Sequence, residues 1–187
     1  MARVVPPWVV ADAPAISFRL LQRDDFPLVG RWIAAPHVQR WWTEPSDAAS
    51  VEARYGPSVD GGDPTRVFLI EVHGQPIGLI QRYRNRDTPE WDRAVGIAAA
   101  AGIDYLIGET DWIGRGVGAA AIRAFTATVW EAYPEVEVVT AAPQQANVAS
   151  WRALERAGYA RVWAGTLDSD DPSDGGPAFV YACTRVR

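Results

Sequence analysis

Three glycines alternate with other residues between Gly114 and Gly118, directly before an apolar stretch typical of a helix. Glycine has no Cβ, so a ligand can approach its backbone closely. Amide groups at the start of a helix carry the positive end of the helix dipole and bind anions. The loop therefore suits a phosphate group, and Arg115 adds a positive charge. A glycine-rich turn with a purely structural role is the alternative.

The spacing of these glycines excludes two known phosphate loops. A Walker loop ends in Gly-Lys-Ser/Thr, whereas Ala119 and Ala120 follow the last glycine here. A dinucleotide-binding loop has its third glycine three residues after the second, whereas this chain reads G-x-G-x-G.

Asp104 is the second residue that could do chemistry, because it interrupts the apolar run AGIDYLIG just before the glycine loop. A carboxylate in such a strand is costly unless it is paired or used. Free aspartate titrates near pH 4, so Asp104 would be charged at pH 7 and could hold a cationic amine and then accept its proton. A solvated position or an ion pair with an arginine are the alternatives.

Aromatic and acidic residues elsewhere could bind such an amine. Trp41 and Trp42 could wall a sugar, although paired tryptophans are more often core, so we expect one of them to face a cleft. Glu90, Trp91 and Asp92 form a cluster in a stretch that reads as a polar loop, where binding residues concentrate, or as a merely solvated loop.

The spacing of the acidic residues from Asp168 to Asp174 resembles part of a calcium-binding loop. The glycine and the final glutamate of such a loop, however, are not at the required positions. This segment reads as a hairpin loop that is solvated or adds negative field near a polyamine. His37 and His73 are too isolated in sequence to predict a metal site.

Composition bounds the class of protein. A chain of 187 residues suits one domain. The net charge of −5 argues against nucleic acid as a partner and is compatible with a cationic ligand. No apolar run reaches the roughly 18 to 20 residues that cross a membrane. Cys183 is the single cysteine, so we expect no disulfide, a buried packing role for this side chain, and a cytoplasmic location.

The elements that would position these residues indicate one α/β domain, 1–187, with a mixed and mostly antiparallel sheet flanked by helices. Residues 1–15 read as an extended arm. We expect a helical segment capped by Asp24 or Asp25 and broken at Pro36. The other expected elements are a strand at 17–22, a short helix that ends at Gly56–Pro57, a hairpin of 66–72 and 75–84 around His73–Gly74, a strand at 101–108, a helix at 117–133, a strand at 136–142, a helix from the cap Asn147 to the stop Gly158, and strands at 159–167 and 177–186.

With these elements in place, the stretches 102–125, 141–162 and 177–186 resemble the GNAT superfamily of N-acetyltransferases. The family loop reads Gln/Arg-x-x-Gly-x-Gly/Ala; the glycines match here, and Ile113 departs from the first position. The resemblance implies acetyl-CoA as acyl donor, with no metal. Its arm would pair with the backbone of Tyr105, Leu106 and Ile107, and Asn147, otherwise a simple helix cap, would contact it. The pyrophosphate would bind the loop Ile113, Gly114, Arg115, Gly116, Val117, Gly118 and Ala119.

The N-terminal half is similar to the aminoglycoside 6′-N-acetyltransferase branch. The segments 37–42, 75–84, 90–92 and 102–104 carry this likeness in order and approximate spacing. Siderophore-type lysine or hydroxylysine N-acyltransferases share the frame, but there a histidine tends to stand where Asp104 stands. The resemblance therefore favours a small cationic amine, an aminoglycoside 6′-amine, as acceptor for a monomer or homodimer. A non-catalytic module that senses acyl-CoA or a cation is the remaining alternative.

Two departures from that branch concern the chemistry. Ala141 stands where an aspartate often binds substrate amines, and Leu154 stands where many members have a tyrosine near the leaving thiol. The leaving thiolate would then be protonated by water, by Tyr159 or by Tyr181. A thiol pKa not far above 8 would also let the reaction proceed without an acid.

Overall fold

The computed structural model describes residues 15–168, 173 and 175–186, without the side chains of Glu90 and Ala94. The predicted arm up to residue 14 lies outside the described part. The acidic positions Asp170, Asp171 and Asp174 lie outside it as well.

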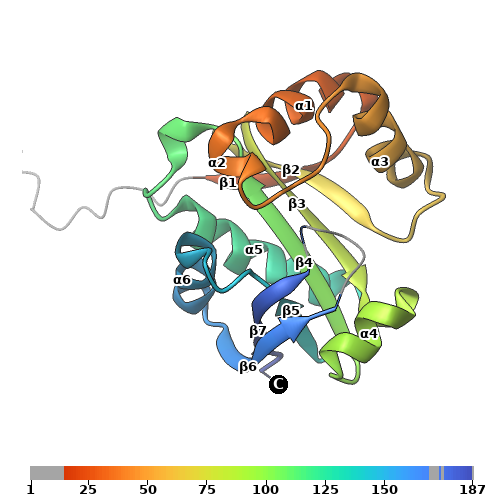
Figure 1. The fold of residues 1–187 in the computed structure, drawn as a ribbon, viewed down its shortest axis with the longest axis vertical. Coiled ribbons are helices and arrows are strands. Elements are labelled where there is room, and N and C mark those ends of the chain that lie inside the picture. The colour runs from red at the N-terminus through yellow and green to blue at the C-terminus, as the bar shows by residue number, and fades with distance from the viewer. Residues whose placement is uncertain (1–14, 169–172, 174, 187) are drawn as a thin grey trace, which may run out of the picture.

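A seven-stranded sheet organises the chain, in the order β1-β2-β3-β4-β5-β7-β6 (Figure 1). All neighbouring strands are antiparallel except β4 and β5, which are parallel. This confirms the predicted mixed and mostly antiparallel sheet. The strands are β1 Ile16–Leu20, β2 Arg66–Val72, β3 Gln75–Arg84, β4 Ala100–Ile107, β5 Val138–Ala141, β6 Ala160–Leu167 and β7 Gly176–Thr184.

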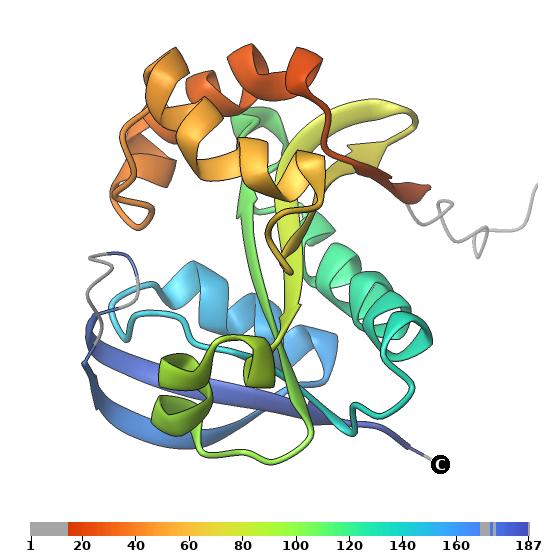
Figure 2. The ribbon, with the colours of Figure 1, turned by 90° about the vertical axis from the view of Figure 1, so that its right-hand side faces the viewer.

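The sheet opens between β4 and β5. The two strands pair only where Ala100–Gly102 meets Val138–Thr140, and β4 then continues to Ile107 with β3 as its only partner. Figure 2 shows the result: β6 and β7 lie across the lower part of the molecule, while β4 runs steeply upward away from them. The chain thus places a wedge-shaped opening in the middle of its own sheet.

Helices cover the sheet in two groups around two hydrophobic clusters. Leu69, Leu79 and Leu106 pack with the first group, and Ile80 and Ile103 pack with the second. Successive side chains of a strand point to opposite faces, so β4 presents residues to both groups. The first group is α1 Phe26–Ala34, α2 Pro36–Gln39 and α3 Ala48–Asp60; the second is α5 Val117–Ala132 and α6 Val148–Ala157.

Two element predictions are wrong. Helix α3 runs through Gly56 and Pro57 to Asp60, because its apolar face, with Val51 and Tyr55 buried, packs on α1 and outweighs the lost backbone bond. The stretch expected as a polar loop contains a helix, α4 Pro89–Val95, which starts with proline at a tolerated position and ends at Gly96 in the left-handed conformation.

The His73–Gly74 turn and the Asn147 cap are confirmed, whereas the expected cap at Asp24 or Asp25 is wrong: Asp25 precedes α1, but its side chain accepts from the Gln22 amide at 2.9 Å and not from an amide of α1. His73 and Gly74 connect β2 to β3 with φ of 51° and 75°. The Asn147 side chain accepts a hydrogen bond from the Ser150 amide at the start of α6, and Gly158 ends that helix with φ of 99°. Three short 3₁₀ helices complete the described elements: η1 Arg23–Asp25, η2 Asn85–Asp87 and η3 Thr110–Trp112.

Candidate active site

A pocket of about 550 Å³ occupies the opening between β4 and β5. Strand β4 divides its lining, because Asp104 and Leu106 point toward α3 whereas Ile103 and Tyr105 point toward α5 and α6. We call these the α3 side and the α5 side. The α3 side is lined by Val38, Trp41, Trp42, Glu44, Arg54, Gln81 and Asp104, and the α5 side by Tyr105, the glycine loop and the first turns of α6.

The glycine loop forms the floor of the α5 side. Gly114 and Gly116 have φ of 75° and 80°, and Gly116 is the residue that precedes the first turn of α5. A Cβ built on Gly114, Gly116 or Gly118 would meet nothing within 4 Å, so their faces are open. The first amides of α5 have no partner within the helix. The loop can therefore receive an anion on its backbone.

The loop residues differ in how they meet the pocket. Ile113, Gly114, Gly116, Gly118 and Ala119 line it. Val117 is buried and Arg115 is exposed, and neither belongs to the lining. Only the backbone amide of Val117 could therefore take part, and Arg115 would act from the rim.

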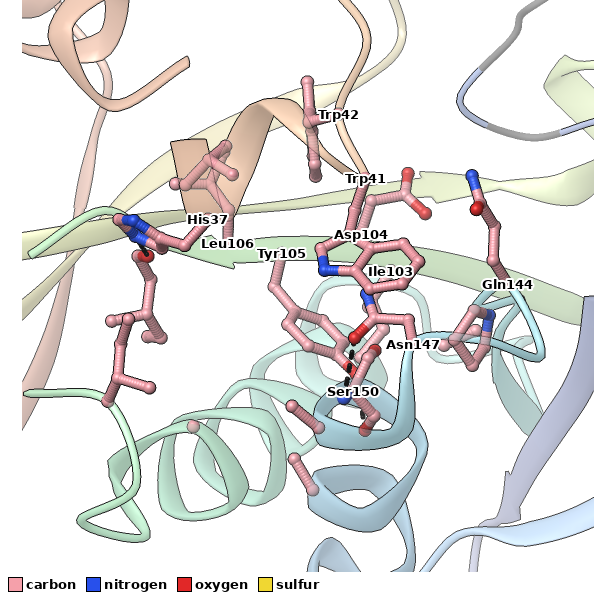
Figure 3. Close-up of a pocket in the computed structure, with 18 of the residues that line it drawn as sticks. His37, Trp41, Trp42, Ile103, Asp104, Tyr105, Leu106, Gln144, Asn147 and Ser150 are labelled. Atoms are coloured by element: carbon pink, nitrogen blue, oxygen red, sulfur yellow. Dashed lines mark hydrogen bonds between the residues drawn. The ribbon is translucent and has the colours of Figure 1, made fainter. Parts of the chain in front are cut away.

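The edge of β4 beyond Gly102 is the second backbone feature of the α5 side. From Ile103 to Ile107 this strand has a sheet partner on its β3 side alone, so the other edge faces the pocket. At its end, His37 Nε2 lies 3.0 Å from the Ile107 carbonyl oxygen, as Figure 3 shows. An extended ligand with amide groups could pair with the edge like an added strand.

Helix α6 contributes a linked set of polar side chains. Asn147 Oδ1 accepts from the Ser150 amide at 3.2 Å, and the Tyr105 and Ser150 hydroxyl oxygens lie 2.8 Å apart (Figure 3). Burial raises the pKa of the Tyr105 phenol far above its usual value, and the bond to Ser150 only partly offsets this. Tyr105 therefore stays protonated and can only donate or accept hydrogen bonds.

Two arginines on α6 were not predicted. Arg152 and Arg156 line the α5 side, four residues apart and hence on one face of the helix. The sequence could have indicated this pair, because both arginines follow the Asn147 cap in the same expected helix, four residues apart. They can hold a phosphate together with the glycine loop.

Asp104 lies half-buried on the α3 side. Its Oδ2 accepts a hydrogen bond from Gln81 Nε2 at 2.9 Å, across the register pair of β3 and β4. Gln81 is 4% exposed, and its Oε1 has no hydrogen-bond partner among the described residues. The sequence analysis missed Gln81, although it interrupts an apolar strand as Asp104 does.

Glu44 and Arg54 were missed as well. Arg54 Nε donates to Glu44 Oε1 at 2.9 Å, and the Tyr55 hydroxyl donates to Glu44 Oε2 at 2.9 Å. Burial lowers the pKa of the Arg54 guanidinium, but the charge and hydrogen bond of Glu44 and the charge of Asp104 outweigh it and raise this pKa. A permanent cation therefore lines the same pocket as Asp104. No local sequence pattern predicts this placement of Arg54.

Both tryptophans line the pocket, so the expectation that only one faces the cleft is wrong. Helix α2 ends at Gln39, and the chain has left helical geometry by Trp42. Consecutive side chains there are not forced onto different helix faces. Figure 3 shows both tryptophans among the side chains around the pocket.

The other predicted acceptor residues do not reach this lining. Trp91 and Asp92 lie on α4 and are absent from it, and the side chain of Glu90 lies outside the described part. Asp168 is exposed and does not line the pocket. From its loop, Ser173 does: its hydroxyl accepts from the Thr43 amide at 3.0 Å.

The structure places both residues that depart from the family pattern, Ala141 and Leu154. Ala141 lines the pocket, so β5 offers no carboxylate there, and Leu154 is fully buried. The Tyr159 hydroxyl lies 2.6 Å from Thr126 Oγ1, and the Tyr181 hydroxyl donates to Glu155 at 3.0 Å. Neither tyrosine lines the pocket, so the structure gives neither a path to a thiol there.

Within the described residues, no three His, Cys, Asp or Glu side chains gather as a metal site would require. In that same part of the chain, every helix is too short or too polar to cross a bilayer. Cys183 is half-buried on β7, and burial raises the pKa of its thiol.

Comparison with known proteins completes the description. The family model described as an acetyltransferase (GNAT) domain matches residues 22–167. Aminoglycoside N(6′)-acetyltransferase type 1 of Klebsiella pneumoniae is 27% identical over 176 residues, covering 91% of this chain and 84% of that protein. The crystal structure of aminoglycoside acetyltransferase AAC(6′)-Ib with coenzyme A and kanamycin matches with a TM-score of 0.75 and 26% identity, over 91% of this chain and 95% of the other.

Proposed function

The chain belongs to the acetyltransferase (GNAT) domain family, and on that premise we propose that it acetylates the 6′-amine of an aminoglycoside. The coarser activity, acetyl-CoA-dependent N-acetyl transfer, follows from the family and from relatives bound to coenzyme A. The acceptor and the role of each residue are the proposed part. One observation supports them: Asp104 on β4 lines the same pocket as the glycine loop and both tryptophans.

The residues of the α5 side fit acetyl-CoA. The open faces of Gly114, Gly116 and Gly118 leave room for a pyrophosphate against the backbone, and Arg152 and Arg156 supply positive charge beside it. The edge of β4 from Ile103 to Ile107 offers amide and carbonyl groups to a pantetheine arm. When bound, acetyl-CoA supplies a thioester carbonyl that an amine can attack.

Asp104 is proposed as the base. An ammonium has no lone pair, so the acceptor must be neutral when its nitrogen attacks. As the nitrogen–carbon bond forms, a proton leaves the nitrogen for the Asp104 carboxylate, directly or through one water. The hydrogen bond from Gln81 Nε2 holds the carboxylate through Oδ2 at 2.9 Å.

Ser150 is proposed to stabilise the leaving sulfur. Its hydroxyl lines the pocket on the α5 side, opposite the face of β4 from which Asp104 acts. When the Tyr105 hydroxyl donates to Ser150 Oγ, the Ser150 proton is free to point at a thiolate. This hydrogen bond does not itself protonate the thiolate, which takes its proton from solvent or leaves unprotonated. It lowers the energy of the negative charge on the departing sulfur.

The α3 side supplies the acceptor site. Trp41 and Trp42 present flat apolar faces to a sugar ring, and Asp104 attracts its amine. Glu44 binds Arg54 and the Tyr55 hydroxyl through its two oxygens. We assign the acceptor amine to Asp104, the other carboxylate of the α3 side. This arrangement favours one ammonium held at the reacting position.

A thiol-release assay with acetyl-CoA tests the proposal. The acceptor panel pairs aminoglycosides that differ only in an amine or a hydroxyl at the 6′ position, and adds a linear polyamine, lysine and N-hydroxylysine. We expect turnover with the 6′-amine and none with its 6′-hydroxyl partner. Faster turnover of lysine or N-hydroxylysine would favour the siderophore-type alternative, and binding of acetyl-CoA without any turnover would favour the sensing module.

A further inference from the structure

Arg54 is a cation of the pocket lining that the proposed reaction leaves unused. Its Nε donates to Glu44 Oε1 at 2.9 Å, and the Tyr55 hydroxyl donates to the other oxygen of Glu44, also at 2.9 Å. Tyr55 is 1% exposed, and the guanidinium lies 5.7 Å from the centre of its ring. A buried residue of α3 therefore anchors the ion pair and holds the guanidinium in place.

The bond to Glu44 uses only one of the three nitrogens of the guanidinium. Within residues 15–168, 173 and 175–186, neither Nη1 nor Nη2 of Arg54 has a hydrogen-bond partner. These two nitrogens carry four N–H donors in a planar fork. The side chain that bears them is 41% exposed. The ion pair therefore leaves two donor nitrogens that a ligand in the pocket can use.

The guanidinium selects its partner by chemical type. It donates hydrogen bonds but has no lone pair to accept one. An ammonium group has none either, and the two positive charges repel each other. A hydroxyl or carboxylate oxygen has lone pairs, and its hydrogen bond to a charged donor is one of the stronger kinds in proteins. A group next to Arg54 is therefore favoured if it is an oxygen and disfavoured if it is an ammonium.

Two other polar groups of the α3 side have the opposite preference. Asp104 carries a carboxyl group, and the Oε1 atom of Gln81 has no hydrogen-bond partner among the described residues. Both offer lone pairs to the N–H bonds of an amine. The α3 side thus combines a part that suits an amine, at Asp104 and Gln81, with a part that suits an oxygen, at Arg54.

We propose that Arg54 is a specificity-determining residue whose two Nη nitrogens bind an oxygen of the acceptor, a ring hydroxyl or a carboxylate, while the reacting amine lies at Asp104. The inference rests on the proposed function for the reaction, but the oxygen contact can be measured without turnover. The preferred acceptor then carries a hydroxyl, and not a second amine, at the position that faces Arg54.

The first experiment uses pairs of aminoglycosides that share the 6′-amine and differ only in a hydroxyl or an amine at another position of that ring. The full chain is saturated with acetyl-CoA, and kcat/KM is measured for both members of each pair. We expect wild type to prefer one hydroxyl compound by roughly 10-fold, the lower end of what a hydrogen bond to a charged group contributes. Arg54→Met should lose most of this preference, and Arg54→Lys, which keeps a charged donor, should retain part of it.

Arg31→Met is the matched control, because Arg31 is exposed on α1 outside the pocket lining. It removes the same charge from the molecule and should keep the wild-type preference. Melting curves report the fold of each variant. If Arg54→Met does not fold because Glu44 has lost its partner, the double variant Arg54→Met with Glu44→Gln removes both charges and takes its place.

The second experiment measures binding alone, by calorimetry with lysine and with 1,5-diaminopentane, which lacks only the carboxylate of lysine. Wild type should bind lysine more tightly, and Arg54→Met should bind the two about equally. A preference in the sugar pairs alone assigns the oxygen to a hydroxyl, and one in the lysine pair alone assigns it to a carboxylate. The inference is overturned if wild type shows neither preference, or if a folded neutral variant keeps the wild-type preferences.

Failure of the proposed function looks different. A wild-type protein that acetylates no aminoglycoside overturns the proposed acceptor, and the lysine pair still decides the role of Arg54. An active wild type whose preferences are unchanged in Arg54→Met overturns the role of Arg54 alone.

Discussion

The two sides of the pocket present different kinds of chemical group to a ligand. The α5 side is mainly backbone: the glycine loop, the first turn of α5 and the free edge of β4. The α3 side is side chains, drawn from α2, the following loop, α3, β3 and β4. The first suits a cofactor common to a whole family, and the second suits an acceptor that differs between members. Recognition by backbone depends on local geometry, whereas recognition by side chains depends on which distant segments meet.

The largest effect should follow from the α3 side. Asp104→Asn keeps the shape and the hydrogen bond to Gln81 but cannot accept a proton, so we expect kcat to fall by roughly 10²–10⁴-fold. The loss should shrink toward pH 9, where more of the amine is already neutral. Steady-state kinetics from pH 6 to 9 measure both effects.

Asp92→Asn is the matched control for that substitution, because Asp92 lies on α4 outside the pocket lining. Its kinetics should equal those of wild type. Full activity in Asp104→Asn would remove Asp104 from the proposed mechanism. A comparable loss in Asp92→Asn would show that the α3 side has been defined by the wrong residues.

On the α5 side, Gly116→Val places a side chain in the open space that we assign to the pyrophosphate. Overpacking costs typically 1–3 kcal/mol, so acetyl-CoA affinity should fall by roughly 5- to 150-fold. Valine is also strained at φ of 80°, which lowers stability. Calorimetric titration and a melting curve separate the two consequences.

Gly74→Val is the control for this strain. Gly74 has φ of 75° and equally open space, but it lies in the β2–β3 turn outside the pocket lining. It should lose a similar amount of melting temperature and keep its acetyl-CoA affinity. Equal affinity losses in both variants would mean that strain, not the pocket, governs binding.

A smaller effect is expected where the two sides meet across β4. Ser150→Ala removes the proposed bond to the leaving sulfur but keeps the Asn147 cap on the Ser150 amide. One hydrogen bond contributes about 0.5–1.5 kcal/mol, so kcat should fall by roughly 2- to 10-fold with little change in acetyl-CoA KM. If KM rises and kcat does not change, Ser150 binds the cofactor arm instead.

The smallest effect concerns the charge of the acceptor. If Asp104 attracts an ammonium in a partly open pocket, added salt should weaken this attraction and raise the acceptor KM by a few-fold. The acetyl-CoA KM, which we assign to the glycine-loop amides together with Arg152 and Arg156, is measured in the same salt series for comparison. An acceptor KM that is independent of salt would argue for recognition by the tryptophan faces alone.

The sequence predicted the fold well because the causes of its elements are local. Alternating apolar residues, the Asn147 cap, the Gly158 stop and the glycines before α5 each act within a few positions. It also singled out Asp104 and the two tryptophans, which the structure brings to one pocket.

Glu44 and Arg54 were missed, because their roles come from a contact between the loop after α2 and α3. Trp91 and Asp92 were singled out for their residue types, but α4 carries them elsewhere on the molecule. The residue types alone could not predict where α4 lies, because its position depends on where the chain turns after η2. Side-chain sites assembled by tertiary contacts are therefore the part that local patterns leave open.

The separation of β4 from β5 has a thermodynamic consequence. It leaves a seam inside the sheet, namely the edge of β4 from Ile103 to Ile107 that has no strand partner. Such edges are otherwise found on the outer strands of a sheet. A ligand that pairs with this seam binds the folded chain and not the unfolded one, so it adds about 2.7 kcal/mol of stability at a concentration 100 times its Kd. If acetyl-CoA binds this edge as proposed, it takes the place of a strand in the sheet, and the lifetime of the protein against unfolding and proteolysis should follow the supply of acetyl-CoA.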